Sequence, residues 1–308
     1  MSELAYGSPR TRMTRRPETS NGARIRTLVR GELPDALYEI PGPPGALWLR
    51  GALPSAGTKY LAVVGSRALS DYGREACERL IAGLAGYPVS IVSGLALGAD
   101  ACAHRAALKA GLHTIAIPGS GITDKVIGPR ANLGLARDIL KAGGALISEH
   151  EGDYLAHPYD FPSRNRIMAG MADAILVIEA GTKSGTLITA RLAGEYGKEL
   201  LVVPHRIGDP HGYGAHLFSR LGAAVVTESL HLLEALHIAP REDAAVRPEP
   251  RDLSAAERAV WQALAEPKAR DEVLRASGSL GPHELLTALI SLELAGYARE
   301  EFGLWRRT

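Results

Sequence analysis

The sequence has few cysteines, few aromatic residues and no excess of either charge. Cys77 and Cys102 are the only cysteines and form no Cys-x-x-Cys pair, which excludes a disulfide framework and a cysteine zinc site and is typical of a reducing cytoplasm. An aromatic content of 5% argues against a stacking-rich groove of the kind found in single-strand-binding barrels. The net charge of +1 excludes a uniformly basic polyanion binder, so a polyanion site has to be a local patch.

Long hydrophobic runs are also missing. No uninterrupted apolar stretch is long enough to span a bilayer, and the arginines near the N-terminus are not followed by the apolar segment of a secretory signal. We therefore expect a cytoplasmic protein. The 308 residues, 46% of them hydrophobic, indicate a globular α/β protein with either a moderate domain and a smaller one or two domains.

Residues 1–32 are rich in arginine, and only Glu3 and Glu18 oppose these arginines up to residue 30. This composition predicts a disordered basic arm. Two interpretations stay open: a terminus without a specific role, and an arm that holds nucleic acid loosely. The arginines are Arg10, Arg12, Arg15, Arg16, Arg24, Arg26 and Arg30.

Residues 33–237 are predicted to form the main domain, which begins with an extended segment rich in proline and glycine up to Pro54. Apolar, β-branched runs then alternate with helical patterns, as in a parallel sheet covered on both faces. We therefore predict a Rossmann-like, doubly wound and mostly parallel α/β sheet. The predicted strands are 60–64, 89–92, 113–117, 145–147, 174–178, 200–203 and 223–226. The predicted helices are 72–84, 99–110, 132–142, 187–196 and 230–236.

A smaller domain is predicted at the C-terminal end. Residues 238–252 are rich in Pro, Glu and Arg and indicate a linker. Helical patterns follow at 253–264, 269–276 and 282–294, and Ser254 with Glu257 forms a capping-box pattern. With an extended end from Gly296 to Arg307, residues 253–308 are predicted to form a small winged-helix domain.

Four loops rich in glycine and hydroxyl residues follow predicted strands, at 65–67, 93–100, 118–121 and 183–186. Ligands bind beyond the carboxyl ends of strands in such sheets, and these residue types suit phosphate groups. The alternative is that the glycines serve backbone conformation alone. The Gly-x-Gly-x-x-Gly fingerprint and the Walker lysine motif are both missing, which argues against an NAD enzyme and against a P-loop ATPase.

Residues 161–170, Phe-Pro-Ser-Arg-Asn-Arg-Ile-Met-Ala-Gly, place two arginines and an amide in a predicted short loop before a helix. Buried arginine is rare unless it is paired, and guanidinium groups bind phosphate in a bidentate manner, so this segment predicts a phosphate or nucleic-acid site. Acidic residues precede it and would weaken the patch if they paired with its arginines. They are Glu149, Glu151, Asp153 and Asp160.

Catalytic and metal-binding patterns are weak, and no catalytic residue, metal or cofactor is predicted. Asp100 and Glu179 end predicted strands, where they could act as a base or bind a ribose, or could cap helices and form ion pairs. His205, His211 and His216 share a loop without the spacing of metal ligands.

At these motifs the sequence resembles the DNA-processing protein A family (DprA, also called Smf). The similarity covers about residues 33–236 in order, and residues 253–307 resemble the family's small winged-helix domain. The matching stretches are 63–67, 93–96 with 98–100, 103–104, 144–149, 161–167, and 179–180 with 184–190.

The resemblance implies a cytoplasmic single-stranded-DNA-binding protein of natural transformation. Such a protein protects incoming strands, helps to load the RecA recombinase onto them, catalyses no covalent reaction and forms dimers through the Rossmann-like domain. By motif, Arg67 and the Arg164–Arg166 stretch would contact DNA phosphates. The full set of expected DNA-binding residues is Ser66, Arg67, Arg130, Arg164, Asn165, Arg166, Lys183, Ser184, Gly185 and Thr186.

The sequence departs from the family pattern at three positions. Gly128 stands before Pro129 where the family has a tyrosine, so Arg130 is expected to contact a phosphate without an aromatic stacking surface beside it. His205 replaces a glycine, and His216 replaces a common asparagine.

Two other functions remain as alternatives. One is a nucleotide-processing enzyme of the phosphoribohydrolase type, with the 184–186 turn and Glu195 as its acid. The other is a duplex-binding regulator acting through the winged helix, but that domain has more acidic than basic residues, so a strong duplex footprint is not expected.

Overall fold

The computed structural model describes residues 19–20, 23–182, 184–241, 252–278, 280–301 and 303–307. The chain divides into two compact units, Met1–Ala239 and Pro240–Thr308, each with its own hydrophobic core. Most of the predicted arm and of the predicted linker lies outside the described residues.

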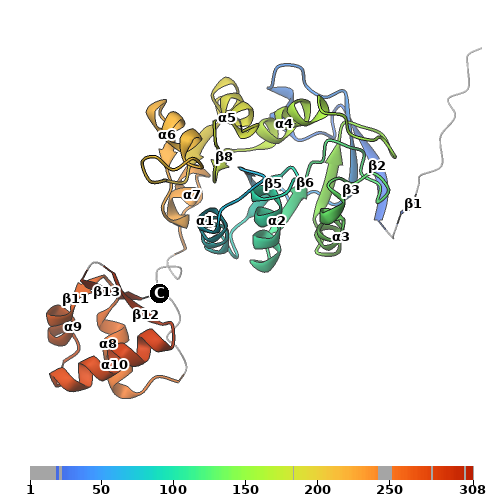
Figure 1. The fold of residues 1–308 in the computed structure, drawn as a ribbon. Helices are drawn as coiled ribbons and strands as arrows, with labels where there is room; N and C mark the ends of the chain where they lie inside the picture. Colours follow the sequence, from blue (N-terminus) through green and yellow to red (C-terminus); the bar gives the residue numbers. More distant parts are fainter. Residues whose placement is uncertain are drawn as a thin grey trace, which may run out of the picture. The chain divides into compact units, whose positions relative to one another are not determined.

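A ten-stranded sheet forms the centre of the first unit, with the order β1-β2-β3-β7-β6-β5-β4-β8-β9-β10 (Figure 1). Strands β4 to β10 pair in parallel, whereas β1, β2 and β3 pair in antiparallel orientation. The strands are β1 (Thr19–Ser20), β2 (Ala23–Val29), β3 (Ala46–Gly51), β4 (Lys59–Val64), β5 (Val89–Ser93), β6 (His113–Ala116), β7 (Ala145–Ser148), β8 (Ala174–Val177), β9 (Glu199–Val202) and β10 (Ala224–Val225).

Strand β4 lies at the middle of the parallel part. The chain adds β5, β6 and β7 on one side of it and then returns to add β8, β9 and β10 on the other. Loops that follow β4 and β8 therefore leave in opposite directions, which opens a crevice beyond the carboxyl ends of these two strands.

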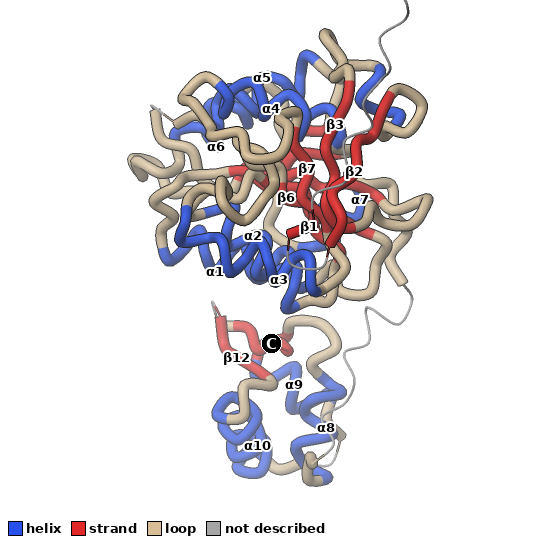
Figure 2. The backbone as a smooth tube through the Cα atoms, turned by 90° about the vertical axis from the view of Figure 1, so that its right-hand side faces the viewer, coloured by secondary structure: helices blue, strands red, loops and turns tan. Residues whose placement is uncertain are grey.

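Helices cover both faces of this sheet (Figures 1 and 2). Helices α1, α2 and α3 lie on one face and α4 and α5 on the other, while α7 packs into the core of the first face and α6 into that of the second. The helices are α1 (Asp71–Ala82), α2 (Ala99–Lys109), α3 (Leu133–Lys141), α4 (Asp160–Met171), α5 (Thr186–Glu195), α6 (Tyr213–Arg220) and α7 (Ser229–Ala235), with short 3-10 turns η1 (Asp35–Tyr38) and η2 (Arg130–Asn132).

Strand β4 shows why the parallel strands are apolar throughout. Leu61 and Val63 belong to the core under α1, α2 and α7, whereas Ala62 and Val64 belong to the core under α4 and α5. Successive strand residues point to opposite faces, so a sheet covered on both faces needs apolar residues at every position. The predicted Rossmann-like, doubly wound and mostly parallel fold is confirmed.

The predicted disordered arm is wrong for its last part. Residues 23–29 form β2, which pairs with β3, and β3 in turn pairs with β7. Arg24, Arg26 and Leu28 lie on the same face of this strand, and of these three side chains only that of Leu28 is buried. The arginine count hid the strand, because exposed charged side chains are compatible with strand pairing.

The described part of the second unit contains three helices and a three-stranded antiparallel sheet of order β11-β13-β12. The capping box is present: Glu257 N–H donates to Ser254 Oγ (3.3 Å) and Ser254 N–H donates to Glu257 Oε2 (2.7 Å). The elements are α8 (Ala255–Ala263), β11 (Lys268–Ala269), α9 (Arg270–Ala276), α10 (Pro282–Leu294), β12 (Ala298–Glu301) and β13 (Leu304–Arg307). None of the helices in the described part of the chain has the length and apolar character needed to cross a bilayer.

Candidate functional site

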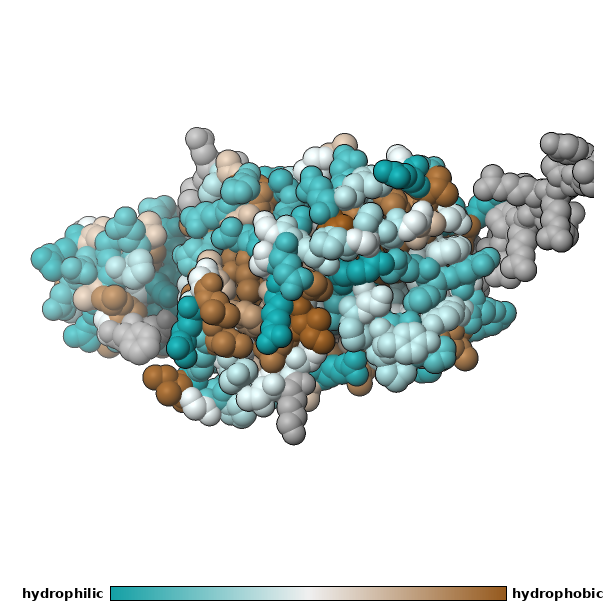
Figure 3. Space-filling view, turned by 90° about the horizontal axis from the view of Figure 1, so that it is seen from above, coloured by the Kyte–Doolittle hydropathy of each residue, from teal (hydrophilic) through white to brown (hydrophobic). Residues whose placement is uncertain are grey.

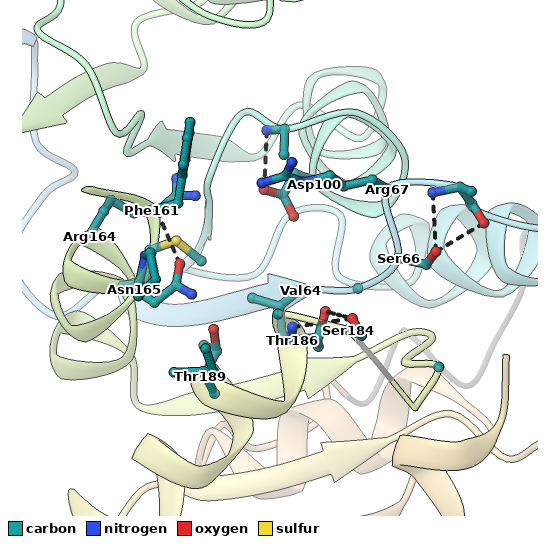
Figure 4. Close-up of a pocket in the computed structure, with 18 of the residues that line it drawn as sticks. Val64, Ser66, Arg67, Asp100, Phe161, Arg164, Asn165, Ser184, Thr186 and Thr189 are labelled. Carbon is teal, nitrogen blue, oxygen red and sulfur yellow. Dashed lines mark hydrogen bonds between the residues drawn. The ribbon is translucent and has the colours of Figure 1, made fainter. Parts of the chain in front are cut away.

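A cavity of about 930 Å³ opens beyond the carboxyl ends of β4 and β8, where the strand order reverses (Figure 4). Its walls come from the loops after β4, β5 and β8, from α4 and from the first turn of α5. The structure thus brings together most of the residues expected to bind DNA. Those that line the cavity are Ser66, Arg67, Arg164, Asn165, Ser184, Gly185 and Thr186.

Arg67 is exposed and lies in the loop after β4. Its guanidinium carbon is 5.4 Å from the centre of the Phe161 ring, and no carboxylate among the described residues lies within ion-pair distance of it. The loop rests on the start of α2, because Ala99 N–H donates to Ser66 O (3.0 Å). Gly98 makes this contact possible, since its φ is +72° and a Cβ there would collide with Ser66 O.

The turn before α5 supplies hydroxyl groups and a helix N-terminus. Ser184 Oγ donates to Thr186 Oγ1 (2.9 Å) and accepts from Thr186 N–H (3.2 Å), while Gly185 is the N-cap residue. Thr189 lies one turn further along α5 and lines the same wall (Figure 4). The N-terminal end of a helix attracts anions, so this wall suits a phosphate.

Arg164 has a different environment from Arg67, since only 9% of it is exposed. Its Nη1 donates to the carbonyl oxygens of Gly94 (2.7 Å) and Ile117. Asp100, also buried, accepts from the N–H groups of Gly94 (3.1 Å) and Ala96 (3.2 Å). Arg164 and Asp100 therefore hold the chain beyond β5 and β6 against α4.

Burial shifts the titration of both groups. It lowers the pKa of Arg164 to about 10, an effect that Asp100 opposes and the charge of Arg67 reinforces. Burial also raises the pKa of Asp100, against the opposing effects of Arg164 and of the N–H groups of Gly94 and Ala96. Arg164 is thus a buried, hydrogen-bonded and positively charged arginine at neutral pH.

Two of the expected DNA-binding residues that the structure describes do not line the cavity. Arg166 forms an ion pair with Glu149 and donates from Nη1 to Gly42 O (2.8 Å). Arg130 donates to Asp124 O (2.5 Å) in the loop after β6. These two arginines therefore do not line the cavity with Arg67 and Arg164, their contact with DNA stays a prediction, and Lys183 lies outside the described residues.

The acidic residues before α4 mostly have partners other than the cavity arginines. Glu149 pairs with Arg166, Asp153 with Lys125 (2.8 Å), and Asp160 with two histidines of its own loop. The charges of Arg67 and Arg164 are therefore not neutralised by these three acids.

Residues 161–166 lie within α4, so the predicted loop there is wrong. Pro162 falls in the first turn of this helix, where its missing N–H costs no intrahelical hydrogen bond. Phe161, Asn165 and Met168 line the cavity with Arg164, because their spacing puts them on one face of the helix. The spacing also turns Arg166 to another face.

Glu179 is fully buried and helps to shape α1. Its carboxylate accepts from Ser70 N–H (3.1 Å) and Ser70 Oγ, and Ser70 is the N-cap residue of α1. His211 Nδ1 is 3.3 Å and His205 Nε2 is 4.0 Å from its oxygens. This geometry supports the capping and ion-pairing interpretation, and no group of three His, Cys, Asp or Glu in the described part of the chain could hold a metal ion.

Sequence reasoning missed Phe161 and Thr189 as site residues. Helical spacing was the signal that could have found them, since Phe161 is three residues before Arg164 and Thr189 three residues after Thr186. Glu195, the acid of the alternative enzymatic function, is exposed at the far end of α5 and does not line the cavity.

A Rossmann-like sheet with a cationic, hydroxyl-lined cavity at the reversal of strand order is typical of proteins that bind phosphate groups. The sequence matches the family described as DNA recombination-mediator protein A over residues 24–237, and the chain belongs to that family.

Several relatives support this assignment. The chain is 37% identical to Protein Smf of Escherichia coli K12 over 270 residues, which cover 86% of this chain and 72% of that protein. It is 39% identical to the DNA processing protein DprA of Streptococcus pneumoniae R6 over 197 residues, which cover 64% and 68% of the two chains.

Two solved structures resemble this chain over about two thirds of its length. The X-ray structure of DNA processing protein A from Streptococcus pneumoniae has a TM-score of 0.65 and 35% identity, covering 70% of this chain and 75% of that one. The protein from Helicobacter pylori, whose structure concerns its single-stranded DNA binding mode, has a TM-score of 0.60 and 28% identity, covering 69% and 95%.

Proposed function

We propose that this protein binds single-stranded DNA in the cavity beyond the carboxyl ends of β4 and β8, without catalysing a covalent reaction. In this proposal it acts in the cytoplasm during natural transformation, where it protects incoming strands and loads the RecA recombinase onto them. The observation that carries the proposal is Arg67, an exposed guanidinium at the cavity that no carboxylate among the described residues neutralises. The hydroxyl groups of Ser184 and Thr186 across the cavity supply further phosphate contacts.

Arg67→Ala tests the binding site. It is expected to weaken binding of an oligothymidylate about tenfold or more, because a charge-assisted hydrogen bond to phosphate is lost. The dependence of log affinity on log salt should flatten by about 0.7, the value for one phosphate contact on a single strand. Fluorescence anisotropy across a salt series measures both.

Arg105→Ala is the matched control, since Arg105 is exposed on α2 and does not line the cavity. It should leave the affinity and the salt slope unchanged. Equal affinities of wild type and Arg67→Ala would contradict the site. Duplex DNA of the same length should bind more weakly than the single strand.

The RecA part of the proposal comes from the family resemblance. Its test is RecA filament formation on single strands that a single-strand-binding protein already covers. Wild-type protein should accelerate it and Arg67→Ala should not.

Arg164 is proposed to hold the loops around the cavity in place, in addition to any contact with a phosphate. Its hydrogen bonds to Gly94 O and Ile117 O already use one end of the guanidinium. Loss of Arg164 would leave Asp100 buried without its cationic partner, so stability as well as DNA binding should fall in Arg164→Ala.

The second unit is proposed to be a winged helix that contacts proteins. Three helices and the β12–β13 hairpin support the fold. The acidic character of residues 253–308 and exposed Leu286, Ile290 and Leu294 on α10 favour a protein partner over duplex DNA.

A homodimer through the first unit is also proposed. Hydrophobic side chains gather on the face that carries α5 and α6 (Figure 3), and Ile188 and Leu221 there are 44% and 72% exposed. The two helices are adjacent, since a Cβ on Gly214 of α6 would lie 3.2 Å from Leu187 Cδ2 of α5. Exposed apolar patches of this kind mark protein interfaces, and a two-fold dimer uses the same patch on both copies.

A further inference from the structure

The loop between β7 and α4 carries four aromatic rings in sequential contact. His150 stacks on Tyr154 with ring centres 4.0 Å apart and 11° between the planes. Tyr154 is tilted against His157 at 5.7 Å, and His157 stacks on Tyr159 at 5.3 Å with 3° between the planes. We call these four residues the aromatic ladder.

A buried carboxylate fixes the aromatic ladder in place. Asp160, at the first position of α4, is 3% exposed and accepts from Tyr154 OH (3.0 Å) and His157 N–H (2.7 Å). His150 Nε2 lies 3.4 Å from its other oxygen. The rings are thus held before any ligand arrives, which lowers the entropic cost of binding.

The Tyr159 end of the ladder is exposed and is flanked in the sequence by residues that line the cavity. Tyr159 is 67% exposed, and its outer face has no ring partner among the described residues. Its sequence neighbours Pro158 and Phe161 line the cavity, where Arg67 lies over Phe161.

We propose that the His157–Tyr159 end of the aromatic ladder is a second subsite for single-stranded DNA, which stacks on an unpaired base of the strand that leaves the cavity. The inference rests on the proposed function and extends it. Every nucleobase has a π-face, and only an unpaired strand exposes it, so an open aromatic ring next to a phosphate site favours single strands over duplex.

The charge around the aromatic ladder agrees with this occupant. The carboxylate of Asp160 is buried and faces two histidines, so it does not present an exposed negative charge to a DNA backbone.

The test compares a short oligothymidylate of about six nucleotides, enough to occupy the cavity, with one of about twenty. Tyr159→Ala should weaken binding of the long strand about tenfold and leave the short strand unchanged, whereas Tyr159→Phe should bind both like wild type. Arg67→Ala should weaken both. Tyr297→Ala removes another exposed tyrosine, in the second unit, and should change neither.

A fluorescent adenine analogue, 2-aminopurine, placed at successive positions of the long strand reports stacking directly. Wild type should quench it at a position beyond the short strand's length, and Tyr159→Ala should abolish that quenching. Unchanged affinity and quenching in Tyr159→Ala would overturn the subsite and leave the proposed function intact. A change in oligomeric mass without a change in quenching would overturn it in favour of a protein interface. Lack of binding to either strand by wild type would overturn both proposals.

Discussion

Two arginines line the cavity in opposite environments, and burial decides what each can do. Arg67 is exposed and can exchange water for a phosphate. Arg164 is 9% exposed and has already exchanged water for the carbonyl oxygens of Gly94 and Ile117. From the sequence both are equally suited to phosphate, because residue type gives charge and not exposure.

His104 leads to a prediction about pH. Its side chain is fully buried on α2. This burial is the largest cause of the shift that lowers the pKa of His104 from 6.5 to about 3. Thr114 Oγ1 donates to Ile91 O (2.9 Å), so the 2.8 Å contact with His104 has Nδ1–H as the donor. The unfolded chain takes up a proton near pH 6.5 that the folded chain does not bind until about pH 3.

The free energy of unfolding should therefore fall as pH decreases below about 6.5. At pH 5 the loss from His104 should be about 2 kcal/mol relative to pH 7. His104→Asn keeps an N–H donor near Thr114 and cannot titrate, so its stability should change less over this range. Urea denaturation at both pH values measures the difference, and an equal loss in the two proteins would contradict the assignment to His104.

At the scale of elements, hydrophobic periodicity predicted most strands and helices of the first unit, and one prediction, at Pro162, was wrong. Strands at 60–64 and 89–92 and the helix at 99–110 were found within about one residue of β4, β5 and α2. Helix α4 was placed too late because Pro162 resembled a loop residue. Proline is compatible with a first helical turn, and neighbouring sequence alone does not distinguish the two cases.

The contact between the β4 loop and α2 predicts the effect of Gly98→Ala. A Cβ at φ +72° would collide with Ser66 O, so the change should cost about 3 kcal/mol and also weaken DNA binding, since Arg67 follows Ser66. Gly111→Ala is the matched control, with φ +67° but nothing within 4 Å, and should cost about 1–2 kcal/mol. Urea denaturation compares the two, and equal losses would show that the collision does not matter.

At the scale of the whole molecule, neutral composition conceals a local cationic site. The net charge is +1, yet the reversal of strand order brings the loops after β4 and β8 to one cavity, which Arg67 and the start of α5 both line. Function at this scale follows from topology, because the residues involved lie more than a hundred positions apart in sequence.

The proposed dimer gives a prediction at this scale. A double change of Ile188→Glu and Leu221→Glu should convert a dimer into a monomer, because it puts like charges on a self-complementary apolar patch. Light scattering after size-exclusion chromatography measures the mass. Leu294→Glu in the second unit, 85% exposed, is the control and should leave the mass unchanged. A monomeric wild type would contradict the proposal.

The sequence by itself determined the doubly wound sheet, since strands buried on both faces must be apolar at each position, and it determined the motif segments that carry the resemblance. Only the tertiary structure decided which arginines meet. The direction of each side chain on α4 turns Arg164 and Asn165 toward the cavity and Arg166 toward Glu149. Burial then separates Arg164 from Arg67, because solvent exposure depends on what the rest of the chain packs around a residue.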